Sequence, residues 1–153
     1  IDGKLLHGML HPEAGHILIT KRDTDHYEGK CPYHKDHCLE GMAAGPAIEA
    51  RWGKKAVELA DCPEVWELEA DYLAQALTNY VMVLSPEMII LGGGVMHQEQ
   101  LFPLIRKKLI TYINGYVITE ELEDPEHYVV PASLHDDQGI MGCLELARRA
   151  LEG

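Results

Sequence analysis

The spacing of apolar residues predicts a long helix in the middle of the chain. From Trp66 onward, apolar side chains recur at intervals of three and four residues, which places them on one broad face of a helix. Pro63 suits the first helical turn and Pro86 follows the last apolar position, so we expect a helix over residues 64–84. A face this broad is typical of a core helix that packs against a sheet and a further element.

Two short apolar runs in the second half of the chain indicate parallel strands. Met88–Leu91 is followed by the glycines 92–94 and by a helical pattern over residues 98–114. Tyr128–Val130 leads through a second glycine turn into a helical pattern over residues 140–151. This alternation of helix, strand, glycine turn and helix is typical of an α/β layer with a parallel sheet.

The first fifty residues have a different pattern. Lys4–Met9 and Gly15–Lys21 are expected to form short strands, and residues 22–40 an irregular, charged loop. A helix is expected over Leu39–Trp52, with a break or kink at Gly45-Pro46 because proline cannot continue the backbone hydrogen bonds.

Asp2-Gly3 is a strong two-residue signal for a β-hairpin turn. Such a turn joins two strands, yet only Ile1 precedes it. We therefore expect residues 1–153 to be the C-terminal part of a longer protein.

Composition limits the classes of function. A chain of 153 residues is long enough for one domain with a real core. Its 13 basic against 25 acidic residues give a net charge of −12, so no basic surface is available to neutralise nucleic-acid phosphates. No apolar run approaches the length of a membrane span, and no signal peptide is visible. We expect a cytoplasmic protein with neither nucleic acid nor membrane as a partner.

A cluster of cysteine and histidine predicts a metal site. Cys31, His34 and Cys38 have the spacing C-x2-H-x3-C, and His16 lies upstream on a separate segment. Two thiolates with two imidazoles form the tetrahedral, borderline-soft donor set that zinc takes in closed structural sites. Three alternatives remain open: a Cys31–Cys38 disulfide, His37 in place of His34, and His16 as a core histidine.

Two carboxylates stand beside the predicted ligands. Glu13 precedes His16 by three residues, and Glu40 follows Cys38 by two. A metal that joins the loop to the His16 segment would also fix both acids. We therefore interpret the metal as structural and the carboxylates as the functional groups.

Glycines follow the expected strand at Met88–Leu91. In open α/β sheets ligands bind beyond the carboxyl ends of strands, and a backbone without Cβ atoms can approach a base or a phosphate closely. Together with Gly45 and Gly139, the run 92–94 suggests a nucleotide site. The P-loop and dinucleotide patterns are absent, so this triple glycine could equally be a simple turn.

These motifs, taken in order, resemble the ROK family of sugar kinases and repressors along essentially the whole chain. His34 replaces a cysteine of the usual family metal loop, a variation similar to the bacterial fructokinase branch. The run Gly45–Gly53 is similar to that branch as well. The segments that carry the resemblance are Glu13–His16, Cys38–Glu40, Ala44–Ile48 and Leu91–Val95.

The resemblance implies one lobe of the actin-like, ribonuclease-H-like α/β architecture, with a zinc-binding loop inserted at about residues 22–40. It implies that Glu13, His16 and Glu40 bind sugar hydroxyls, and that His16 also ligates zinc. The implied zinc ligands are His16, Cys31, His34 and Cys38, and the implied nucleotide-side backbone positions are Gly45, Gly93, Gly94 and Gly139.

Two family motifs are not found in residues 1–153: the phosphate-binding Asp-x-Gly-Gly-Thr and the Asn-Asp-x-Asn-Ala that carries the general base. Asp136 and Asp137 are poor substitutes for that base, because both stand at an expected helix N-cap, where aspartate is structural. We therefore expect that residues 1–153 lack the N-terminal lobe. We also expect the isolated chain to have no kinase activity.

The full-length parent is expected to phosphorylate a hexose with Mg²⁺ and ATP, converting fructose to fructose 6-phosphate, as a homodimer. The helix over residues 64–84 is a candidate contact surface. The alternatives are the sugar-sensing half of a ROK-type repressor and a zinc-stapled interaction module without ligand chemistry.

Overall fold

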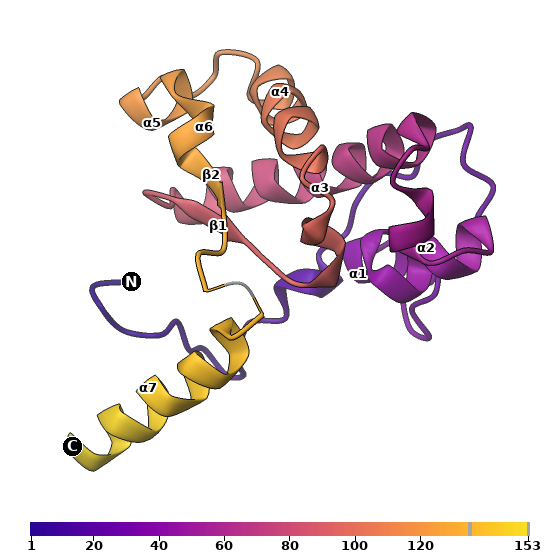
Figure 1. The fold of residues 1–153 in the computed structure, drawn as a ribbon. Coiled ribbons are helices and arrows are strands. Elements are labelled where there is room, and N and C mark those ends of the chain that lie inside the picture. Colours follow the sequence, from indigo (N-terminus) through magenta and orange to yellow (C-terminus); the bar gives the residue numbers. More distant parts are fainter. Residues whose placement is uncertain (135, 153) are drawn as a thin grey trace.

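Helix α3 (Pro63–Leu84) is the element around which the molecule is built (Figure 1). The computed structural model describes residues 1–134 and 136–152. Pro63 occupies the first turn of α3, and Ser85 ends it in the left-handed conformation with a φ of 43°. The helix predicted from the apolar spacing is thus confirmed within one residue at each end.

The main core lies between α3 and α4 (Leu101–Ile113), which begins after a 3₁₀ turn, η3 (Gly94–His97). The 3₁₀ turn η2 (Ala56–Leu59) covers one end of this core, and the Trp66 indole N–H donates to the Leu59 carbonyl at 2.8 Å. Fully buried side chains from both helices meet there, among them Trp66, Ala70, Leu101, Ile105 and Leu109.

A two-stranded parallel sheet packs beside this helical pair. Strand β1 (Ile89–Leu91) pairs with β2 (Val129–Pro131), with Leu91 opposite Pro131. The parallel pairing confirms the α/β layer expected from the sequence. The Arg106 guanidinium on α4 donates to the Val129 carbonyl at 3.0 and 2.8 Å and so ties helix to sheet. Two short helices that the pattern did not predict, α5 (Glu120–Glu123) and α6 (Pro125–Tyr128), lead into β2.

The strands expected at Lys4–Met9 and Gly15–Lys21 are wrong. Asp2 and Gly3 do form the tight turn, with φ values of 52° and 73°, but residues 4–9 have no strand partner in the described part of the chain. Residues 14–16 instead form a 3₁₀ turn, η1 (Ala14–His16), and Leu18 makes only an isolated bridge to Cys38. Strand structure needs a hydrogen-bonded neighbour, which an apolar pattern alone cannot supply.

The helix expected over Leu39–Trp52 is divided into α1 (Leu39–Ala43) and α2 (Gly45–Trp52). Ala44, with an extended backbone, separates them just ahead of Pro46, as the Gly-Pro signal predicted. Helix α1 packs on α3 through a second, smaller group of buried residues: Ile19, Met42, Ala43, Tyr72 and Ala76.

The last helix, α7 (Gln138–Glu152), projects away from the rest of the molecule and lies beside the N-terminal segment (Figure 1). A hydrogen bond from the Arg149 guanidinium to the Gly3 carbonyl, at 3.3 Å, joins α7 to that segment. The helix contributes no buried residue among those described. In the part of the chain that the structure describes, no helix has the length and apolar character needed to cross a membrane.

Candidate functional site

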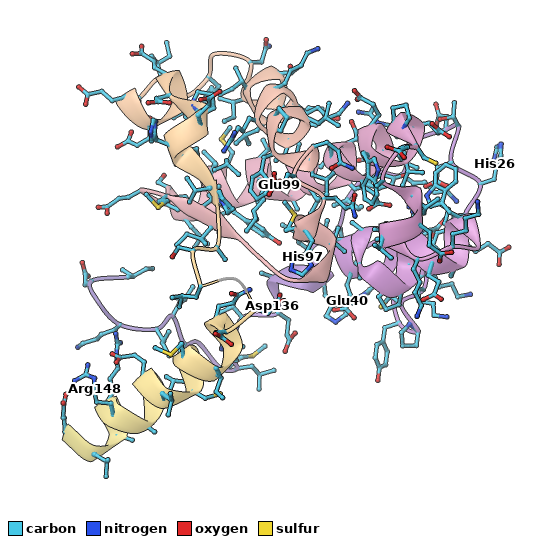
Figure 2. The ribbon with its side chains drawn as sticks, viewed as in Figure 1. His26, Glu40, His97, Glu99, Asp136 and Arg148 are labelled. Atoms are coloured by element: carbon cyan, nitrogen blue, oxygen red, sulfur yellow. The ribbon has the colours of Figure 1, made fainter. Side chains whose placement is uncertain are left out.

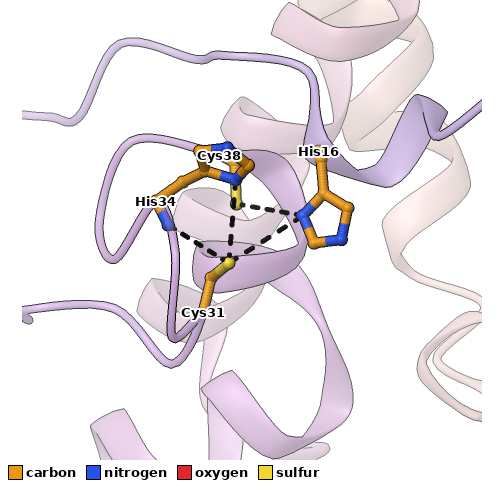
Figure 3. A group of neighbouring side chains, drawn as sticks. All are labelled: His16, Cys31, His34 and Cys38. Atoms are coloured by element: carbon orange, nitrogen blue, oxygen red, sulfur yellow. Dashed lines mark hydrogen bonds between the residues drawn. The ribbon is translucent and has the colours of Figure 1, made fainter.

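The four predicted metal ligands converge on one point (Figure 3). The ligand atoms of His16, Cys31, His34 and Cys38 all lie within 4.8 Å of one another. His16 Nδ1 is 3.9 Å from Cys31 Sγ and 3.8 Å from Cys38 Sγ, and His34 Nδ1 is 3.8 Å from Cys31 Sγ. Tetrahedral zinc with two sulfur and two nitrogen ligands separates its donors by roughly 3.3–3.8 Å, so these spacings suit such an ion.

The surroundings of both sulfurs suit thiolate ligands. The backbone N–H of His34 donates to Cys31 Sγ, and that of Gly41 donates to Cys38 Sγ, each at 3.4 Å. The His34 contact lowers the pKa of the Cys31 thiol, whereas burial raises the pKa of the Cys38 thiol. A metal cation would favour the charged form of both thiols. The donor set and its hydrogen bonds therefore fit structural zinc.

The geometry separates the alternatives that the sequence left open. The His37 side chain is 75% exposed, and its Nε2 lies 3.5 Å from Asp36 Oδ1 rather than in the cluster. Cys31 and Cys38 are both unbonded thiols, so no disulfide joins them. His16 is half-buried, with its Nδ1 facing the two sulfurs.

Two glycines allow the loop to fold around the ligands. The Lys35 backbone, which has a φ of 50°, lies directly against Gly29 and Gly41. A Cβ added to either glycine would overlap the Lys35 carbonyl. Gly29 also has a φ of 79°, a region that L side chains rarely adopt. Sequence reasoning missed both glycines, because their role depends on a contact with the far side of the loop.

The segment that carries His16 lies against the start of α1. His16 Nε2 is 3.5 Å from Glu40 Oε2, while the other ring nitrogen faces the sulfurs. A carboxylate on the second nitrogen of a metal-binding histidine fixes the orientation of the ring. The Tyr80 hydroxyl donates to the Ala14 carbonyl at 2.5 Å and so anchors this segment to α3.

Both candidate substrate-binding carboxylates lie at this junction. Glu13 immediately precedes η1 and is exposed, and its carbonyl accepts the His16 N–H at 3.0 Å. Glu40 is in the first turn of α1, with a side chain 55% exposed. A Cβ on Gly15 would lie 3.4 Å from Glu40 Oε2, so these two segments are in contact. Carboxylates held like this beside solvent can accept hydrogen bonds from a polar ligand.

A cleft of about 680 Å³ opens at the carboxyl ends of β1 and β2. Gly92 and Gly93 form part of its floor, and Gly93 has a φ of 91°. Residues 131–133, which end β2 and follow it, also line the cleft. The cleft lies where open α/β sheets bind their ligands.

The four glycines predicted for the nucleotide side do not all line this cleft. Gly93 does; Gly94 is the next residue and begins η3, and Gly139 is in the first turn of α7. Gly45 begins α2, and a Cβ there would lie 3.8 Å from Val95 Cγ2 on η3. Gly45 thus connects the metal-loop side of the molecule to the glycine loop.

One side chain that sequence reasoning missed, His97, lines the cleft together with Asp136. His97 Nε2 lies 2.9 Å from Asp136 Oδ1, joining the segments that follow β1 and β2 (Figure 2). Asp136 therefore faces His97, while Asp137 directly precedes α7. The only sequence signal for His97 was its position just after the triple glycine.

Comparison with known proteins shows the family of the chain. The model of the ROK family matches residues 1–150 of the chain. The chain belongs to the ROK family.

Three similar proteins show how the ROK chain relates to known members. A Bacillus subtilis (strain 168) protein provisionally named a fructokinase is 52% identical over 99% of this chain and 51% of its own length. A fructokinase of Pediococcus pentosaceus is 45% identical over 97% of the chain and 50% of its own length. The ROK hexokinase of Thermus thermophilus superimposes with a TM-score of 0.71 at 22% identity, covering 95% of this chain and 52% of that one.

The structural likeness shows that this ROK chain has the actin-like fold of the family, as expected. The chain spans about half the length of the curated relatives it matches.

Proposed function

We propose that the chain forms one lobe of an ATP-dependent sugar kinase with fructose as its hexose. The observation that carries the proposal is the junction of η1 with α1, where Glu40 contacts His16 and Gly15 next to a four-ligand metal cluster. The names of the Bacillus subtilis and Pediococcus pentosaceus relatives, both of which include the word fructokinase, support a sugar as the substrate.

In this proposal zinc is structural. His16, Cys31, His34 and Cys38 would hold it, and the ion would supply fixed geometry to a loop with little apolar content. Glu13 lies three residues before His16, and Glu40 lies two residues after Cys38. A metal that fixes the positions of these two ligands therefore also fixes the backbone of the two acids.

Glu13, His16 and Glu40 would bind the sugar. A carboxylate oxygen accepts hydroxyl protons, and such charge-assisted hydrogen bonds are the strong ones when water is excluded. These residues would orient one hydroxyl toward the terminal phosphate of the nucleotide. Catalysis of phosphoryl transfer depends mainly on such positioning and on stabilising charge.

The cleft beyond β1 and β2 would take Mg-ATP. Gly92 and Gly93 in its lining have no Cβ atoms, so a base or a phosphate can approach the backbone there. The family motif that carries the general base is not found in residues 1–153. Phosphorylation would therefore need the N-terminal lobe of the full-length parent, which we propose to be a homodimer.

Sugar binding is tested by calorimetry of the chain with fructose, with glucose as the comparison sugar. Glu40→Gln should weaken fructose binding about tenfold or more, because it removes one charged acceptor. Glu49→Gln, on the exposed face of α2, is the matched control and should leave binding unchanged. Equal fructose affinity in wild type and Glu40→Gln would contradict the assigned sugar site.

The nucleotide and activity parts of the proposal have separate tests. A fluorescent ATP analogue with Mg²⁺ should bind the chain and be displaced by ATP. A coupled kinase assay of the isolated chain should show no turnover. Turnover comparable with that of a full-length relative would show that the general base lies within this chain after all.

A further inference from the structure

A buried cluster of ionisable side chains, Asp25, Arg51 and Glu69, lies between the metal loop (residues 22–40) and α3. The Arg51 side chain on α2 is 6% exposed, that of Asp25 is 4% exposed, and that of Glu69 on α3 is fully buried. Arg51 Nη1 donates to Glu69 Oε1 at 2.6 Å, and its Nη2 lies 3.3 Å from Asp25 Oδ2. Burying ionisable groups costs free energy unless they are closely paired and hydrogen-bonded, so each close contact of Arg51 fixes the position of its partner.

Arg51 contacts the chain at both ends of the metal loop. Near the start of the loop it meets Asp25, and its Cζ lies 4.7 Å from the centre of the Tyr27 ring. Beyond the loop, Arg51 Nη2 donates to the Met42 carbonyl at 2.9 Å, in the short helix that carries Glu40. One guanidinium thus joins the segment entering the loop to the helix leaving it.

The neighbours of Arg51 are themselves held in place. The Tyr72 hydroxyl donates to Asp25 Oδ2 at 2.7 Å, and Asp25 Oδ1 accepts the Tyr27 backbone N–H at 3.0 Å. The planar fork of arginine can hold several acceptors at once, which the single ammonium of lysine does not reproduce.

We infer that Arg51 is the positioning residue of the metal loop: it clamps both ends of residues 25–42 against α3, so that Cys31, His34, Cys38 and Glu40 are held in register for His16 to complete the site. This inference rests on the metal site proposed above. Among the described residues Arg51 contacts Asp25, Tyr27, Met42, Glu69 and Tyr72, none of which is a proposed metal ligand or sugar-binding residue. Its effect therefore passes through the backbone that carries those groups.

The test compares zinc release with global stability. Arg51→Met keeps most of the apolar stem and removes the donors. Zinc-loaded protein is mixed with a colorimetric chelator, and we expect release to be about tenfold faster or more, since partners around a metal site tune its affinity by about 10–100-fold. Leu109→Ala, in the α3–α4 core away from the loop, is the control for lost stability: its unfolding free energy should fall, with zinc release near the wild-type rate.

Two further variants protect the test against misfolding. Asp25→Asn keeps the shape of the acid and weakens one contact of Arg51, so it should accelerate release by a smaller factor. Arg51→Lys should recover only part of the wild-type behaviour. If release from Arg51→Met were no faster than from Leu109→Ala at equal loss of stability, the clamp would be wrong.

A second measurement separates this inference from the metal proposal. The Lys35 side chain is exposed while its backbone packs against Gly29 and Gly41. Limited trypsin cleavage after Lys35 should therefore be faster in Arg51→Met, where the loop is loosened, than in wild type and in Leu109→Ala. A wild-type chain that takes up no zinc would overturn the metal site, while trypsin would still report on the clamp. Equal cleavage of all three proteins would overturn the role of Arg51.

Discussion

At the scale of single residues, Glu69 should make stability depend on pH. Burial raises the pKa of Glu69 to about 8, although Arg51 opposes this shift. The folded state therefore holds the Glu69 proton more tightly than the unfolded state, in which the pKa is near its usual value. The stabilisation is complete below about pH 4.5 and is lost as the pH rises to about 8.

We expect the unfolding free energy to fall by about 2 kcal/mol between about pH 6 and about pH 8, measured by urea denaturation. Glu69→Gln should remove this part of the pH dependence, because it has no proton to lose. Glu67→Gln, exposed on the same helix, should keep the wild-type profile. A profile for Glu69→Gln as steep as that of wild type would show that Glu69 is ionised in the folded protein throughout this range.

At the scale of elements, the metal loop depends on the absence of side chains at its base. Gly41→Ala would drive a Cβ into the Lys35 carbonyl, which is backbone and cannot rotate away. We expect a loss of about 1–3 kcal/mol in unfolding free energy together with a lower zinc content by elemental analysis. Gly142→Ala on α7 has open space around it and is the control, expected to be neutral or slightly stabilising.

The metal ligands give a related prediction for the same loop. Cys31→Ser or His34→Ala should abolish the content of about one zinc per chain and lower the thermal midpoint, because metal binding contributes directly to folding of the loop. His37→Ala should retain zinc, since its side chain points into solvent. Loss of zinc in His37→Ala alone would reverse the assignment of the histidine ligand.

At the scale of the whole molecule, α7 should be the least stable helix. Its apolar residues are exposed, Ile140 by 63% and Leu144 by 59%, and its ion pairs lie at the surface. Surface pairs of this kind contribute little, and an isolated helix of this length is marginal in water.

Hydrogen exchange followed by mass spectrometry tests this difference. Amides of α7 should exchange about 100-fold faster or more than those of α3, whose opening requires disruption of the core. Protection of α7 equal to that of α3 would mean that the helix packs on another surface in solution. Resistance of α7 to exchange only at high protein concentration would point to contact with a second copy.

Much of the architecture and part of the site followed from local pattern. Residues 64–84 have a helical period along with proline at each end, so α3 needed no tertiary information. The glycine run after β1 marked the edge where the cleft lies, and the Cys/His spacing named four side chains that do converge. These features are local because helix period, turn chemistry and ligand spacing act over a few residues.

Tertiary structure decided what depends on contacts between distant segments. Residues 4–9 have the pattern of a strand but form none, because a strand exists only beside another strand. Three contacts in and around the candidate site likewise could not be predicted from local pattern: His97 with Asp136, Gly41 with Lys35, and Arg51 with Asp25 and Glu69. In each contact the partners are far apart along the chain or separated by a loop. The chain by itself specified its long helices and the donor set of the candidate metal site, because both follow from local spacing. The packing of distant segments decided which buried side chains hold that site in place.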